Sequence, residues 1–193
     1  MLTIRKNVFE TNSSSCHSIS FASDSAEGYS GRVLYADGED FGWEYNVLCT
    51  PQKKFSYWVV ASLYNIYNQL WKEAKDDYKS KWEDDPSYDE WNFPWNTKIV
   101  AKYNDKVEYI KKEVEDYFAS KDVTIIWRDD DRGFNYGLFA EDHEPSINGY
   151  IDHQSAPDED TLCKDFAELW KSPEELFNFI FNSSTITTDN DNH

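Results

Sequence analysis

Apolar side chains recur at three- and four-residue steps through residues 55–78, and this pattern constrains the fold more than any other feature of the chain. The repeat consists of Phe55, Trp58, Val59, Leu63, Ile66, Tyr67, Leu70, Trp71, Ala74 and Tyr78. This spacing places the side chains on one face of a helix, and that face packs against a core. The residue before a proline disfavours helical geometry, so the helix ends before Pro86. We predict a long amphipathic helix that starts near Gln52.

A second stripe with the same period follows an aromatic loop at residues 84–96. It comprises Ile99, Val100, Tyr103, Val107, Ile110, Val114, Tyr117 and Phe118. This stripe predicts a second amphipathic helix. Residues 122–127 come directly after it and form the clearest strand in the chain. Their continuous apolar character favours a central strand that is covered on both faces.

Both ends of the chain contribute further elements. Residues 2–50 hold short β-prone runs that glycines interrupt. Near the other end, we expect one short helix at about residues 158–170. A second begins at Ser172, with Pro173 at the first helical position and Glu175 completing a capping box.

These elements predict a single α+β domain over residues 1–193. Its mainly antiparallel sheet is packed by two long amphipathic helices and two short C-terminal helices. Ile186 is expected in a last short strand, and residues 189–193 in a mobile polar tail.

The chain is strongly acidic, with 37 acidic and 19 basic residues and a formal net charge of −18. Acidic chains with few aromatic residues are typically disordered. This chain has 8 Trp, 13 Tyr and 12 Phe, which is enough bulk for a core. We therefore expect a folded protein whose negative surface repels nucleic acid and acidic membranes and attracts basic partners in a salt-dependent way.

Several features predict a cytoplasmic protein. No segment approaches the roughly 20 apolar residues that a transmembrane helix needs. The basic N-terminus has no apolar stretch behind it, unlike a secretory signal. The three cysteines are widely separated and odd in number, which favours reduced thiols.

The acidic residues are densest at residues 129–160, where ten acids accompany one base, Arg132. Glycines in this stretch favour strands and loops over helix. Carboxylates on a rigid fold can imitate a phosphate backbone and attract a basic surface electrostatically. The candidate partner-binding residues are Asp129, Asp130, Asp131, Glu141, Asp142, Glu144, Asp158, Glu159 and Asp160.

A polar run near the N-terminus supplies the candidate catalytic residues. Serine and asparagine commonly bond to nearby backbone, so one interpretation is a structural turn. The other is a loop whose donors hold an anion or a polar ligand. An enzyme would need the fold to bring this run to a second histidine segment. The residues concerned are Ser15, Cys16, His17, Asp152 and His153.

No motif indicates a metal or a cofactor. His143, His153 and Cys163 lack the close pairs that are typical of zinc sites. The chain also has no phosphate-binding loop, dinucleotide-binding turn or metalloprotease helix. We therefore expect neither a metal nor a cofactor.

The run at residues 8–18, V-F-E-T-N-S-S-S-C-H-S, resembles the start of uncharacterised proteins of tailed bacteriophages and their hosts. That group usually has threonine where this chain has Cys16. Residues 150–155 and 190–192 are similar to the same group. The resemblance implies a phage or prophage protein in the cytoplasm of an infected bacterium. It also favours one pocket that gathers His17, Asp152, His153 and residues 189–191.

Two functions follow from these patterns. The first is an acidic phage-type binding protein that inhibits a host nucleic-acid-binding enzyme, such as a CRISPR effector, another defence nuclease or the transcription machinery, by occupying its basic surface. It would bind neither nucleic acid nor membranes directly. The second is a small hydrolase or transferase that acts on a nucleotide-like substrate. A virion or assembly component is a third possibility. The sequence favours the first function, which is not enzymatic.

Overall fold

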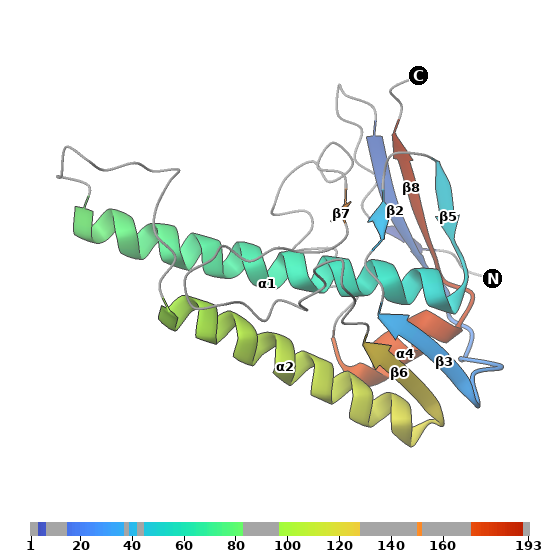
Figure 1. Ribbon diagram of the computed structural model, residues 1–193. Helices are drawn as coiled ribbons and strands as arrows, with labels where there is room; N and C mark the ends of the chain where they lie inside the picture. Colours follow the sequence, from blue (N-terminus) through green and yellow to red (C-terminus); the bar gives the residue numbers. More distant parts are fainter. Residues whose placement is uncertain are drawn as a thin grey trace.

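The computed structural model describes residues 4–6, 15–36, 39–41, 45–82, 97–127, 150–151 and 171–190 (Figure 1). Its elements are β1 (Ile4–Lys6), β2 (Ser15–Phe21), β3 (Arg32–Ala36), β4 (Asp40–Phe41), β5 (Asn46–Leu48), α1 (Pro51–Trp82), α2 (Thr97–Ser120), β6 (Val123–Trp127), β7 (Tyr150–Ile151), α4 (Pro173–Phe181) and β8 (Thr185–Asn190). Helices and antiparallel strands occur together, which confirms the α+β class. No described helix is both long enough and apolar enough to span a membrane.

The main sheet unites the two ends of the chain. Its order is β1-β2-β8-β5, and every neighbouring pair is antiparallel. Two further pairs, β3 with β6 and β4 with β7, are parallel. Figure 1 shows the four-stranded sheet beside the N-terminal end of α1, while α1 and α2 run side by side.

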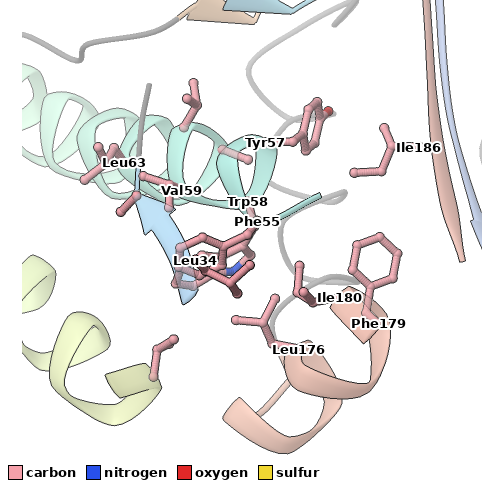
Figure 2. Close-up of a cluster of buried hydrophobic side chains, with 14 of the residues drawn as sticks. Leu34, Phe55, Tyr57, Trp58, Val59, Leu63, Leu176, Phe179, Ile180 and Ile186 are labelled. Atoms are coloured by element: carbon pink, nitrogen blue, oxygen red, sulfur yellow. The ribbon is translucent and has the colours of Figure 1, made fainter. Parts of the chain in front are cut away.

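Both long helices are confirmed, but the first half of α1 is more deeply buried than an amphipathic helix requires. Every residue at positions 54–63 is buried. Figure 2 shows the reason, because side chains from β3, α4 and β8 gather around this half of α1. A helix that is enclosed by neighbours on several sides is buried around its circumference. The first half of α1 is therefore the centre of the core.

Gln52 at the start of α1 fixes the position of β3. Its side-chain Nε2 donates to the Tyr35 carbonyl at 2.7 Å, and its Oε1 accepts from the Tyr35 amide at 2.9 Å. The amide of Gln52 thus bonds to Tyr35 as a neighbouring strand would.

The expectation that the strand at residues 122–127 is covered on both faces is wrong. Within the described chain β6 pairs with β3 alone, and its residues alternate between covered and exposed. Ile126 is 40% exposed. One face of β6 packs on the core and the other faces solvent, although the sequence is apolar on both.

The C-terminal expectations have mixed outcomes. The helix predicted from Ser172 is α4, whereas the helix expected at residues 158–170 lies outside the described residues. Asp189 and Asn190 belong to β8, where we expected the start of a tail, because both pair with β2. Residues 191–193 lie outside the described part.

The cap of α4 gives a direct test. The Ser172 hydroxyl accepts a hydrogen bond from the Glu175 amide at 3.1 Å, and Pro173 follows the cap. Ser172→Ala removes the acceptor and should lower the free energy of unfolding by about 1 kcal/mol. Ser172→Asp keeps an acceptor and should stay close to wild type. Urea denaturation of the three proteins measures both effects, and equal stability of Ser172→Ala and wild type would contradict this role.

Candidate functional site

The structure places the candidate residues Ser15, Cys16 and His17 in β2. We expected a turn or loop here, and for these three residues that expectation is wrong. Neighbouring positions of a strand belong to opposite faces of the sheet. Cys16 and His17 therefore do not form a catalytic pair as sequence neighbours. Residues 7–14 of the same run lie outside the described residues.

The pairing of β2 with β8 brings part of the expected polar cluster together. Ser15 is opposite Asn190, Cys16 is opposite Asp189, and His17 is opposite Thr188. Residues from the two ends of the chain are thus neighbours in one sheet, which the sequence resemblance favoured for His17 and the Asp189 segment.

The second half of that cluster is not described. Asp152 and His153 directly follow β7, and both lie outside the described residues. Within the described chain β7 pairs with β4, and β2 pairs with β1 and β8. The convergence of the two histidine segments therefore stays a prediction.

The nine candidate partner-binding acids also lie outside the described residues. They are Asp129, Asp130, Asp131, Glu141, Asp142, Glu144, Asp158, Glu159 and Asp160. Strand β7 interrupts this stretch of chain, since it lies between residues 128–149 and 152–170. Ile151 of β7 is buried and pairs with Phe41, which is buried as well. The acid-rich stretch is thus attached to the core near its middle.

The described helices and strands carry little net charge. Of the 37 acidic and 19 basic residues in the chain, they hold 12 acids and 14 bases. Residues 128–149 and 152–170, on either side of β7, hold 12 acids and three bases. The sequence predicted a negative surface, but it gave no sign that the helices and strands would be balanced.

Lys54 is the most unusual ionisable residue in the described chain. It is 0% exposed, and its Nζ donates to the carbonyls of Phe179, Asn182 and Ser184 at 2.7, 2.8 and 3.1 Å. Burial lowers the pKa of Lys54 to about 8, and the negative charge of Asp24 acts in the opposite direction. An ammonium group has three donors, and all three are used here. Lys54 therefore positions backbone and is not available as a nucleophile.

Asp24 accepts hydrogen bonds from Ser183, which lies in the same turn between α4 and β8. Its carboxylate accepts from the Ser183 hydroxyl at 2.7 Å and from the Ser183 amide at 2.9 Å. These hydrogen bonds lower the pKa of Asp24. Sequence reasoning found neither Asp24 nor Lys54. The one local signal was a lysine, Lys54, directly before the apolar stripe of a helix.

The described residues contain no metal centre. No group of three or more His, Cys, Asp or Glu side chains among them is arranged to hold a metal ion. Cys49 is a free and exposed thiol.

Comparison with protein-family models, with curated proteins and with solved structures finds no significant match.

Removing the Lys54 ammonium should destabilise the fold. Lys54→Met keeps an unbranched side chain but leaves three carbonyls without their donor, which should lower the free energy of unfolding by about 3 kcal/mol. Lys53 is the matched control, because it is half-exposed and forms a surface ion pair with Glu39. Lys53→Met should cost less than about 1 kcal/mol. Urea denaturation compares the variants, and equal losses would contradict the role of Lys54.

Lys54 should also give stability a characteristic pH dependence. Its pKa is about 8 in the folded state, against an ordinary value of 10.5 for the unfolded chain. Below pH 8 both states hold the proton, so stability does not change through this group. Between the two pKa values the unfolded state holds the proton that the folded state has released, and stability should rise with pH.

The measurement is the difference in free energy of unfolding between wild type and Lys54→Met from pH 7 to 10.5, in which other titrating groups cancel. A wild-type advantage that stays constant or falls with rising pH over this range would show that the folded state retains the proton, and would contradict the lowered pKa.

Proposed function

We propose that this protein binds a basic, nucleic-acid-binding surface of a host protein and blocks it, using acid-rich segments held on a nearly neutral frame. "Frame" here means the described helices and strands. The observation that carries the proposal is the segregation of charge, with 12 acids and 14 bases in the frame and 12 acids with three bases in residues 128–149 and 152–170.

Ion pairs of the frame support this division. Five of its lysines pair with nearby carboxylates, which compensates part of the frame charge where it lies. The pairs are Lys53–Glu39, Lys81–Asp77, Lys102–Glu73, Lys111–Glu108 and Lys112–Asp116. The acids of the other segments have few basic residues in their own segments to neutralise them. They are thus the main source of the field that a basic partner would meet.

The two segments beside β7 contain the largest share of these acids. Residues 128–149 and 152–170 together hold 12 acids and three bases. Each is attached to the frame at both ends, through β6, β7 and the residues before α4. Attachment at both ends keeps many carboxylates close to one frame, and a dense negative charge accelerates association with a basic surface.

The resemblance of residues 8–18 to phage proteins defines the setting of the proposal. In a phage-infected bacterium the proteins with large basic surfaces include CRISPR effectors, other defence nucleases and the transcription machinery. A protein that occupies such a surface would compete with the nucleic acid that normally binds there. We therefore propose an inhibitor or modulator of a host nucleic-acid-binding enzyme.

The test is capture of host proteins by the tagged chain from bacterial lysate, at low and at roughly physiological salt. We expect a nucleic-acid-binding protein that added double-stranded DNA releases. A variant with amides at Asp129, Asp130, Asp131, Glu141, Asp142 and Glu144 should lose at least about 90% of the capture, because the phosphate-like charges are gone.

The matched control removes the same number of charges from outside the acid-rich segments. It has amides at exposed positions, namely Glu27, Asp76, Asp105, Glu108, Glu113 and Glu174. Capture by this variant should stay within about twofold of wild type, since these screened charges contribute little. Equal losses in both variants would mean that bulk charge alone acts. No nucleic-acid-binding partner at either salt would refute the proposal, and a nucleotide screen for thermal stabilisation would then test the hydrolase or transferase.

A further inference from the structure

A groove follows the edge of β6 on the side away from β3. Its volume is about 270 Å³, and it is lined by Glu115 and Ala119 of α2 together with Asp122, Val123, Thr124 and Ile125. The face of a strand would contribute only every second residue. Three consecutive β6 residues, with Asp122 directly before them, therefore indicate that the groove runs along the strand edge, with α2 as its opposite wall. Figure 1 shows β6 between β3 and α2.

The edge of β6 has the properties of a site for an added strand. Within the described chain β6 pairs with β3 alone, so its second edge has no described strand beside it. The solvent-facing side of the β3–β6 pair includes two exposed apolar side chains, Ile126 at 40% and Val33 at 44% exposure. An extended peptide that adds to a sheet edge uses main-chain hydrogen bonds for affinity and alternate side chains for specificity.

The negative charge of the groove favours a basic peptide. Two lining residues are acidic, and none of the described lining residues is basic. The nearby lysines have other contacts, since Lys112 pairs with Asp116 at 2.6 Å and Lys121 lies over the Tyr117 ring at 5.4 Å. No described hydrogen bond or ion pair holds the Glu115 carboxylate. It is therefore available to a cation in the groove.

We propose that β6 accepts an extended basic segment of a partner protein as an additional strand. Alternate residues of that segment would face opposite sides. Basic residues would point to α2 and meet Glu115, while β-branched residues would lie on the outer side beside Ile126. The small side chain of Ala119 leaves the space that the incoming strand needs.

The other two possible occupants have the wrong charge. A second copy of the chain carries a net charge of −18, and the acid-rich segments of the same chain are also negative. Like charges facing each other oppose association. This surface belongs to the nearly neutral frame, so its test does not depend on the proposed function of the acid-rich segments.

The probe is a short fluorescein-labelled peptide of alternating lysine and valine, and fluorescence anisotropy at roughly physiological salt measures its Kd. The reference peptide has the same number of lysines but proline in place of valine, so it carries the same charge and cannot add as a strand. We expect the valine peptide to bind wild type at least about tenfold more tightly than the proline peptide.

Two substitutions in α2 locate the binding, each with a control at an exposed residue of the same helix. Ala119→Trp fills the groove and should weaken binding at least about tenfold, whereas Ala101→Trp should leave it unchanged. Glu115→Gln removes the carboxylate and should weaken binding about two- to fivefold, with Glu113→Gln as its control. Slower hydrogen exchange of the β6 amides with bound peptide tests the site without any substitution.

Any of the following results would contradict the proposal. No binding of the valine peptide means that the edge does not accept a strand. Equal binding of both peptides means that charge alone acts. Binding that Ala119→Trp leaves unchanged, with unchanged exchange of the β6 amides, places the peptide elsewhere. A wild-type dimer that Ala119→Trp abolishes would make a second copy the occupant.

Discussion

The arrangement of this fold depends on one buried ammonium group. Lys54 of α1 binds the carbonyls of Phe179, Asn182 and Ser184, where the chain leaves α4 and enters β8. A positive charge is favourable at the C-terminal end of a helix, since unpaired carbonyls concentrate negative charge there. The Phe179 ring at 5.3 Å and the charge of Asp24 add to this. Because β8 lies between β2 and β5, this one contact orients the whole four-stranded sheet against α1.

A nearly neutral frame makes such a fold compatible with a highly charged chain. Repulsion between like charges destabilises a compact state. Here the described helices and strands hold 12 acids and 14 bases, whereas residues 128–149 and 152–170 hold 12 acids and three bases. The core around α1 therefore forms without strong repulsion between like charges. In the proposed function, the acid-rich segments carry the charge that a partner meets.

The sequence predicted what is local and missed what joins distant parts of the chain. The periodicity of α1 and α2 and the cap at Ser172 are local signals, and all three are confirmed. The polar run at Ser15 resembled a turn because its side chains commonly bond to nearby backbone. Its real partner is β8, from the other end of the chain, and no local pattern reports such pairing. Lys54 was missed for the same reason, since its acceptors lie more than a hundred residues away. The candidate acids lie outside the described residues, so their arrangement stays a prediction.

The two proposed surfaces meet at one point of the chain. Strand β6 ends at Trp127, and the first acid-rich segment begins directly after it. Charge acts over about a Debye length, roughly 8 Å at physiological salt, and attracts many basic surfaces without distinguishing them. Strand addition acts at contact and requires an extended segment with alternating side chains. When one partner offers both features, binding of the first raises the effective concentration of the second. A partner with a basic surface and an extended basic segment would therefore be held far more tightly than one with either feature alone. This combination would let a strongly acidic protein select its target among the many basic proteins of a cell.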